Sequence, residues 1–231
     1  MRTIGMIGGM SWESTLVYYR IINQAVRERL GGLHSAKSIL YSVDFAEIEA
    51  LQHAGRWDAA QSILVQAAQS LVRAGADLVI ICTNTMHKLA DGVAASVTVP
   101  LLHIADPTAE AVLAAGVNTV ALLGTRFTME EEFYRKRLED RYGLRVLIPD
   151  AVQRQTVHDT IYTELCLGRI REGSRQAYLR IIEDLVERGA QGVILGCTEI
   201  GLLVRAESCP VPVFDTARIH AEAAVTAALT V

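Results

Sequence analysis

Residues 187–199 read Glu-Arg-Gly-Ala-Gln-Gly-Val-Ile-Leu-Gly-Cys-Thr-Glu, and they repeat residues 73–85, which read Arg-Ala-Gly-Ala-Asp-Leu-Val-Ile-Ile-Cys-Thr-Asn-Thr. The two copies lie 114 residues apart, since 187 − 73 = 114. Each copy is a short apolar run that ends in a small polar segment, the pattern of a buried strand followed by a polar turn. We expect two half-sites that face one another. Because Cys197 aligns with Thr83, only one half presents a thiol.

Two further matches extend this repeat in the same order. Residues 4–9, Ile-Gly-Met-Ile-Gly-Gly, resemble residues 120–125, Val-Ala-Leu-Leu-Gly-Thr, at an offset of 116 (120 − 4 = 116). Residues 99–105, Val-Pro-Leu-Leu-His-Ile-Ala, resemble residues 211–217, Val-Pro-Val-Phe-Asp-Thr-Ala, at an offset of 112 (211 − 99 = 112). Three matches in unbroken order, with nearly constant spacing, predict two homologous halves.

Short apolar runs alternate with longer amphipathic stretches throughout the chain, as in repeated βα units around parallel sheets. The expected strands are 3–7, 38–43, 78–81, 101–104, 119–123, 145–148, 192–195 and 211–214, and the expected helices are 12–29, 58–73, 129–142, 174–188 and 217–229. The pattern predicts an α/β fold of two pseudo-symmetric, doubly wound parallel-sheet domains. Ligands bind such sheets beyond the carboxyl ends of the strands, so we expect the active site in the cleft between the domains.

The offsets also suggest where the chain crosses between the halves. We expect an N-terminal domain of residues 1–98 plus 211–231 and a second domain of residues 99–210, with the last helix returning to the first domain.

The composition is typical of a soluble globular protein: of 231 residues, 51% are hydrophobic and 21% charged. The net charge of −4 gives no reason to expect a nucleic-acid or anionic-membrane partner. The chain shows no signal-peptide pattern and no run of about 20 apolar residues, so we expect a cytoplasmic protein. Its four cysteines are scattered and its six histidines never fall at i, i+4, so neither a disulfide framework nor a metal site is indicated.

Cys197 is the strongest candidate for chemistry. It follows an apolar strand, precedes Thr198-Glu199 and lies near an expected helix start, a position that lowers the pKa of a thiol. A single cysteine in an apolar chain is more often a packing residue, but the polar flanks and the aligned site at Thr83 favour a functional role. Cys82 is adjacent to Thr83, and neighbouring strand residues point to opposite faces. We therefore expect Cys82 to face the helix layer.

Three polar segments are candidates for substrate binding. Residues 7–11, Ile-Gly-Gly-Met-Ser, open the first helix, where backbone amides near Met10 could hold an anion, although a tight turn capped by the serine is equally compatible. Thr83-Asn84-Thr85 offers hydroxyls and an amide for a carboxylate or ammonium group, or else a helix cap. Gln52, in an expected loop after the second strand, is either a substrate contact or part of a solvated surface.

These motifs resemble those of a known family. Residues 8–15 read Gly-Gly-Met-Ser-Trp-Glu-Ser-Thr, residues 82–87 read Cys-Thr-Asn-Thr-Met-His and residues 196–203 read Gly-Cys-Thr-Glu-Ile-Gly-Leu-Leu. In this order and over this length they resemble the cofactor-independent aspartate/glutamate racemase family, and within it the bacterial L-aspartate/glutamate-specific or broad-specificity amino-acid racemases. The resemblance implies two pseudo-symmetric α/β domains, a small amino-acid substrate, no pyridoxal phosphate or metal, and a homodimer.

The resemblance also assigns roles. In the family two cysteines flank the substrate α-carbon, one removing the α-proton and the other reprotonating the opposite face. Here only Cys197 matches, and Thr83 stands at the other cysteine's position, as in the subgroup expected to prefer the L enantiomer. The groups that would hold the substrate carboxylate are Asn84, Thr85, Thr198 and the backbone near Met10. Glu199 would suit the ammonium group.

A second departure concerns the substrate side chain. Some family members hold its carboxylate with basic residues, but residues 48–52 and 162–166 offer no cation here. Gln52 and backbone amides are the alternatives, or the substrate is less acidic. Two other functions fit a single catalytic cysteine on this architecture: a decarboxylase or isomerase of a small carboxylic acid, and a non-catalytic carboxylate-binding protein.

Overall fold

The computed structural model of the chain describes residues 1–230. The chain forms two compact units: unit 1 is Met1–Ile104 together with the C-terminal segment from His220, and unit 2 is Ala105–Ile219. Each unit is an α/β structure built on one four-stranded parallel sheet.

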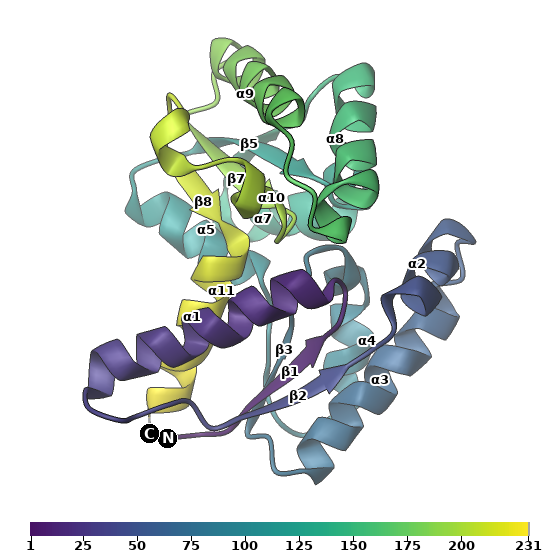
Figure 1. Cartoon of the computed structure of the whole chain (residues 1–231), viewed down its shortest axis with the longest axis vertical. Coiled ribbons are helices and arrows are strands. Elements are labelled where there is room, and N and C mark those ends of the chain that lie inside the picture. The colour runs from purple at the N-terminus through teal and green to yellow at the C-terminus, as the bar shows by residue number, and fades with distance from the viewer. Residues whose placement is uncertain (231) are drawn as a thin grey trace. The chain divides into compact units, whose positions relative to one another are not determined.

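Unit 1 has the strand order β2-β1-β3-β4. Its strands are β1 (Ile4–Gly8), β2 (Ser38–Ser42), β3 (Leu78–Ile81) and β4 (Leu101–Leu102), and its helices are α1 (Trp12–Leu30), α2 (Phe45–His53), α3 (Trp57–Arg73), the 3-10 helix η1 (Thr85–Leu89), α4 (Ala90–Ala95) and most of α11 (Thr216–Leu229). A buried core joins alternate strand residues, such as Val79 and Ile81, to Leu64, Ala67 and Leu71 of α3. This packing covers one face of the sheet, as α3 does in Figure 1.

Unit 2 has the strand order β6-β5-β7-β8. Its strands are β5 (Thr119–Gly124), β6 (Arg145–Leu147), β7 (Gly192–Gly196) and β8 (Val213–Asp215), and its helices are α5 (Ala105–Ala114), α6 (Arg126–Glu130), α7 (Glu132–Tyr142), α8 (Ala151–Thr163), η2 (Leu165–Leu167), α9 (Glu172–Glu187), α10 (Ile200–Leu203) and η3 (Ala206–Ser208). A buried core places α8 and α9 on the face of the sheet from which Val193 and Leu195 project, and Figure 1 shows both helices beside β5 and β7.

The two sheets have the same topology, which confirms the fold class expected from the internal repeat. The two central strands of each sheet are β1 and β3 in unit 1, and β5 and β7 in unit 2. They pair in the same register: Ile7 lies opposite Ile81 in unit 1, and Leu123 lies opposite Leu195 in unit 2. The offsets of these pairs, 116 (123 − 7) and 114 (195 − 81), are those of the sequence repeat. The repeat therefore reports a duplicated βα architecture.

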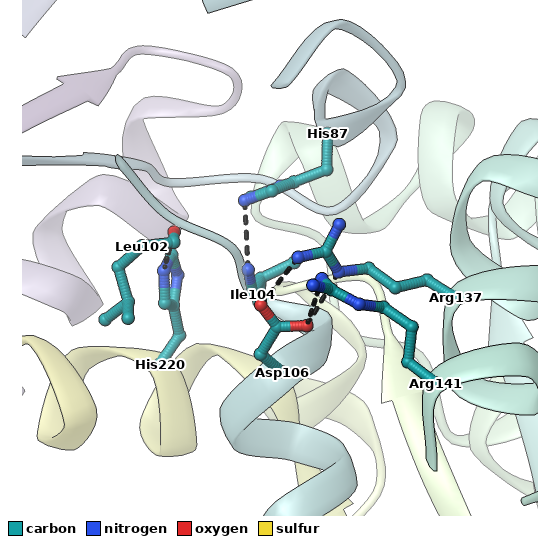
Figure 2. Close-up of polar contacts among 7 residues, drawn as sticks. All are labelled: His87, Leu102, Ile104, Asp106, Arg137, Arg141 and His220. Atoms are coloured by element: carbon teal, nitrogen blue, oxygen red, sulfur yellow. Dashed lines mark hydrogen bonds and ion pairs between the residues drawn. The ribbon is translucent and has the colours of Figure 1, made fainter. Parts of the chain in front are cut away.

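The chain crosses between units later than the expected ranges of 1–98 plus 211–231 and 99–210. β4 pairs with β3 in unit 1, and β8 pairs with β7 in unit 2, so each short strand stays with the sheet that precedes it in sequence. The helix after each of these strands enters the other unit: α5 belongs to unit 2, and α11 belongs to unit 1 from His220 onward. Asp106 of α5 accepts two hydrogen bonds from Arg137 of α7, at 2.6 and 2.7 Å (Figure 2).

Five α-helices of residues 1–230 were not expected from the sequence, and one expected helix is divided. Those missed are α2, α4, α5, α8 and α10, and the stretch 129–142 forms α6 and α7 with a break at Glu131. Within residues 1–230, no helix combines the length and the apolar character that crossing a bilayer requires.

Candidate active site

In unit 1 the turn between β1 and α1 is tightly determined. Gly9 has a φ of 94°, and a Cβ at this position would overlap the carbonyl oxygen of Val43. The Gly9 amide donates to Thr15 Oγ1 at 2.9 Å, and Ser11 caps α1 by accepting from Ser14 N. Met10 is 3% exposed and its side chain packs in the core beneath α3. The expected serine cap is present, and the substrate contact expected of the Met10 backbone stays a prediction.

The polar segment after β3 also lies at the carboxyl end of the unit 1 sheet. Thr83 is partly exposed, whereas Asn84 and Thr85 are buried at 1% and 5% exposure. Asn84 occupies the N-cap position of η1, but its side chain makes no capping hydrogen bond there. The structure therefore does not show the capping alternative for Asn84, and its expected contact with a substrate stays a prediction.

Gln52 lies on a helix and is buried, so its assignment to a solvated surface loop is wrong. It is the penultimate residue of α2, is 3% exposed, and its Nε2 donates to Met86 Sδ at 2.9 Å. Because Met86 belongs to η1, this contact places the Gln52 amide beside the helix that carries Thr85.

In unit 2 the polar segment after β7 forms a compact hydrogen-bonded group. Cys197 is 8% exposed, and its Sγ donates to Glu199 Oε2 at 2.9 Å. Thr198 Oγ1 donates to the same carboxylate oxygen, also at 2.9 Å. Glu199 is 2% exposed. The three residues are brought together by their own backbone turn at the end of the strand.

The electrostatics of Cys197 differ from the sequence expectation. Burial raises the pKa of this thiol well above its usual value, and the negative charge of Glu199 raises it further. The expected helix dipole is weak because α10, which follows, is a single turn, Ile200–Leu203. The expectation of a lowered pKa was wrong: the raised pKa favours the neutral thiol, which donates its hydrogen bond to Glu199.

Cys82 faces away from the group that contains Thr83, as expected. Alternate residues Val79 and Ile81 belong to the core beneath α3, whereas Cys82 does not. In unit 2, Val193, Leu195 and Cys197 belong together to the equivalent core beneath α8 and α9. Cys82 is completely buried, and burial raises the pKa of its thiol far above the usual range.

Several polar residues of unit 2 escaped the sequence interpretation. Gly124 lies opposite Gly196 in the sheet, so the next residue, Thr125, lies beside Cys197 at the same edge. Thr125 caps α6, and its hydroxyl is 3.2 Å from that of Thr128. The amide of Arg126 donates to Nδ1 of the buried His158 at 3.2 Å. The repeat carried a signal for Thr125, since it aligns with Gly9, but His158 had none because α8 was missed.

Cys166 packs against the core that contains Cys197, and its thiol contributes to the raised pKa of Cys197. Among residues 1–230, no group of three or more histidine, cysteine, aspartate or glutamate side chains is placed to hold a metal ion.

The deciding observation is a family match over almost the whole chain. The sequence model for Asp/Glu/hydantoin racemases matches residues 7–224. The chain belongs to the Asp/Glu/hydantoin racemase family. It is accordingly an enzyme of the isomerase class, and the resemblance noted from the three motifs is confirmed.

Individual relatives agree with this membership. A Yersinia pestis protein of known structure, assigned as an Asp/Glu racemase, is 56% identical over the full length of both chains with a TM-score of 0.92. An aspartate racemase homologue from Pyrococcus horikoshii is 37% identical, again over both full lengths, with a TM-score of 0.86. The broad-specificity amino-acid racemase RacX of Bacillus subtilis is 22% identical over 227 residues, which is 96% of each chain.

Proposed function

We propose that this protein inverts the α-carbon of aspartate, glutamate or a related amino acid without pyridoxal phosphate, with Cys197 and Thr83 as the two proton-transfer groups. One observation carries the proposal. Leu195 of β7 and Ile81 of β3 occupy equivalent positions in the two sheets, and Cys197 and Thr83 each follow two residues later. Two groups in equivalent positions of a duplicated fold suit a reaction with two mirror-image steps. The family membership and the names of the relatives support the substrate class.

The first proton transfer takes place inside unit 2. The Cys197 thiol gives its proton to Glu199 Oε2, with which it already shares a hydrogen bond of 2.9 Å. The thiolate then removes the α-proton of one enantiomer, and the electron pair of the C–H bond remains on the α-carbon and its carboxylate. A thiolate is an effective base, whereas the thiol is not.

The second transfer completes the inversion. The Thr83 hydroxyl delivers its proton to the opposite face of the α-carbon. The proton held by Glu199 then returns through solvent to the Thr83 alkoxide, which restores the resting enzyme. Because a hydroxyl is a weaker acid and base than a thiol, the step through Thr83 is the harder one. The L enantiomer is then the preferred substrate, with Cys197 acting on its face.

The carbanion needs donors around the substrate carboxylate, since no cofactor delocalises the charge. Asn84, Thr85, Thr198 and the Met10 backbone supply them in this proposal. Glu199 has two proposed roles. Its Oε2 accepts hydrogen bonds from Cys197 and Thr198, and its negative charge attracts the substrate ammonium group. Gln52 is proposed to contact the substrate side chain.

The decisive experiment follows the α-proton directly. Proton NMR in deuterated water, with separate L and D enantiomers of aspartate, glutamate and neutral amino acids, should show loss of the L α-proton signal and appearance of the D product. Cys197→Ala should abolish exchange, whereas Cys82→Ala should retain it because that thiol points to the other face of the sheet. Absence of exchange with every amino acid would overturn the proposal.

A second candidate is favoured by the threonine at position 83. With one strong proton-transfer group and one weak one, the site also suits a decarboxylase that protonates an enediolate on a single face. Release of carbon dioxide from a malonate-type acid, without α-proton exchange in amino acids, would identify that activity.

The surroundings of the reaction are part of the proposal. We propose a cytoplasmic homodimer that acts on a free amino acid, with no nucleic-acid or membrane partner. The dimer is supported by an apolar surface of unit 1 that we call the α1/β2 patch. It consists of Trp12, Leu16, Tyr19 and Leu40, which are exposed by 64%, 60%, 51% and 47%.

A further inference from the structure

Three histidines lie buried together in unit 1. His87, His103 and His220 are exposed by 3%, 7% and 0%. The ring centroids of His87 and His103 are 4.6 Å apart, and those of His87 and His220 are 5.7 Å apart. His87 is close in sequence to Thr83, but the cluster forms only because η1, β4 and α11 meet in the folded unit.

The contacts of His87 determine its protonation. Its Nδ1 lies 2.7 Å from the carbonyl oxygen of Thr83, and a carbonyl oxygen can only accept, so Nδ1 carries a proton. Its Nε2 lies 3.1 Å from the amide nitrogen of Ile104, which can only donate, so Nε2 carries none. Figure 2 shows the His87 ring directed at the Ile104 amide. His87 is therefore a neutral imidazole that joins the end of β3 to the end of β4.

His220 makes a parallel contact that does not reach Thr83. Its Nε2 lies 2.9 Å from the carbonyl oxygen of Leu102 on β4 and must donate to it (Figure 2). Its Nδ1 is 2.9 Å from the Tyr18 hydroxyl. His220 thus links α11 to β4, and it serves as a natural control for His87.

The Thr83 side chain depends on its backbone for its direction. Thr83 is partly exposed, and its hydroxyl makes no hydrogen bond to the described residues 1–230. The Cα–Cβ bond is therefore oriented by the peptide groups on either side of Thr83. One of these contains the carbonyl that accepts from His87 Nδ1.

We propose that His87 is a positioning residue for Thr83: its Nδ1–H fixes the Thr83 carbonyl and thereby the face from which the Thr83 hydroxyl protonates the substrate. This inference rests on the proposed racemase function and adds a residue that acts on one of its two steps only. Loss of the contact should impair reprotonation by Thr83 while leaving proton removal by Cys197 intact, because the carbonyl that His87 holds belongs to Thr83 itself.

A pair of substitutions separates the two hydrogen bonds of His87. In His87→Asn, the side-chain amide can replace Nδ1–H and still donate to the Thr83 carbonyl. In His87→Gln, the amide oxygen reaches the position of Nε2 and can accept from Ile104, but the Thr83 carbonyl loses its donor. His220→Gln is the matched control, since its amide can still donate to Leu102.

The measurement is the fate of L-aspartate or L-glutamate in deuterated water. Each α-proton removed is replaced either with retention, through Cys197, or with inversion, through Thr83, and the ratio of inverted to retained deuterated product is independent of how much enzyme is folded. We expect His87→Gln to lower this ratio about tenfold or more, since small displacements of a reacting group have large effects on rate. His87→Asn should lower it less, and His220→Gln should leave it unchanged.

The outcomes distinguish the inference from the function on which it rests. If the wild-type protein exchanges no α-proton, the racemase proposal fails. If it exchanges and inverts, but His87→Gln keeps the wild-type ratio, the positioning role fails. Should His87→Gln not fold, nitrogen NMR of the wild-type imidazole decides: a proton on Nδ1 is expected, and a proton on Nε2 alone would overturn the inference.

Discussion

A thiol and a hydroxyl occupy equivalent positions in the two sheets, and their surroundings differ as much as their chemistry. The Cys197 thiol donates a hydrogen bond to the Glu199 carboxylate, whereas the Thr83 carbonyl accepts one from His87. In the proposed mechanism the first contact prepares a base, and the second positions a proton donor. An asymmetric reaction on a symmetric scaffold therefore needs only a few local substitutions.

Glu199→Gln tests the carboxylate beside Cys197. Removing the negative charge removes one cause of the raised thiol pKa, so the Cys197 pKa should fall while the proton acceptor is lost. We expect the thiolate absorbance of the variant to appear at lower pH than in the wild type, and the rate of α-proton exchange to fall by about a hundredfold. The absorbance change should be absent in Cys197→Ala. A rate equal to that of the wild type would exclude Glu199 as proton acceptor.

The burial of Cys82 predicts that the free energy of unfolding falls at alkaline pH. Below pH 9.0, the ordinary pKa of a cysteine thiol, the Cys82 thiol is protonated in both the folded and the unfolded chain. Above it the unfolded chain ionises while burial keeps the folded thiol neutral, so the free energy of unfolding falls by about 1.4 kcal/mol per pH unit. Denaturant unfolding of Cys82→Ala on either side of pH 9.0 should show a shallower loss, with exchange activity retained. An unchanged slope would contradict the buried, neutral thiol.

At the scale of elements, the site is built from segments that follow strands. The β1–α1 turn, the Thr83–Thr85 segment and the Cys197–Glu199 segment all lie at the carboxyl ends of β1, β3 and β7. Their rigidity comes from the turns themselves, because each is closed by local hydrogen bonds. The positions of the proposed catalytic groups therefore depend on hydrogen bonds within their own turns.

Gly9→Ala measures the rigidity of the first turn, with Gly55→Ala as its matched control. Both glycines have positive φ, at 94° and 69°, but a Cβ at Gly9 would overlap Val43 whereas one at Gly55 would meet no atom within 4 Å. Gly55→Ala should cost about 1 kcal/mol for its backbone conformation alone. Gly9→Ala should cost more than about 2 kcal/mol, measured by denaturant unfolding. Equal losses would show that the turn can relax around an added methyl group.

Much of this element level could be predicted from the sequence, and the failures have physical causes. The strands and the long helices α1, α3, α9 and α11 carry clear apolar periodicity. In contrast, α8 buries only Val157, His158, Thr160 and Ile161, so half of its buried face is polar and its pattern is weak. Helix α5 has Pro107 in its first turn, which sequence patterns associate with a break although the position tolerates proline. Both helices are held by tertiary contacts.

The motifs of the candidate site could be located from the sequence, but their electrostatics could not. Cys197, Thr198 and Glu199 are neighbours in sequence, so their motif was visible directly. The sign of the Cys197 pKa shift depends on burial and on the direction of the Glu199 side chain, which no linear pattern contains. The histidine cluster was invisible for a related reason, since His220 joins His87 only through the fold.

For the whole molecule, the α1/β2 patch is the feature that a single chain leaves unexplained. β2 is an edge strand of its sheet, and Leu40 on that strand continues the apolar surface of α1. An exposed edge beside large apolar side chains is a surface that proteins usually cover. A second copy of the chain is the occupant that the proposed homodimer supplies.

Leu16→Glu tests that assignment, and Leu33→Glu is its control. Leu16 is 60% exposed within the patch, while Leu33 is fully exposed in the loop before β2. A buried carboxylate at a dimer contact is strongly unfavourable, so Leu16→Glu should convert dimer to monomer in light scattering. Leu33→Glu should leave the mass unchanged. A wild-type monomer, or a Leu16→Glu dimer as stable as the wild type, would contradict the patch as the interface.

The exchange of helices between the units has a consequence for how the chain is made. Unit 2 is one continuous segment, Ala105–Ile219, and has all of its strands and helices once that segment has left the ribosome. Unit 1 is synthesised first, yet it lacks α11, whose Ala228 carbonyl accepts from the Arg2 amide and whose His220 bonds to Leu102. The N-terminal half must therefore wait for the last helix, and the second half of the nascent protein completes its fold before the first.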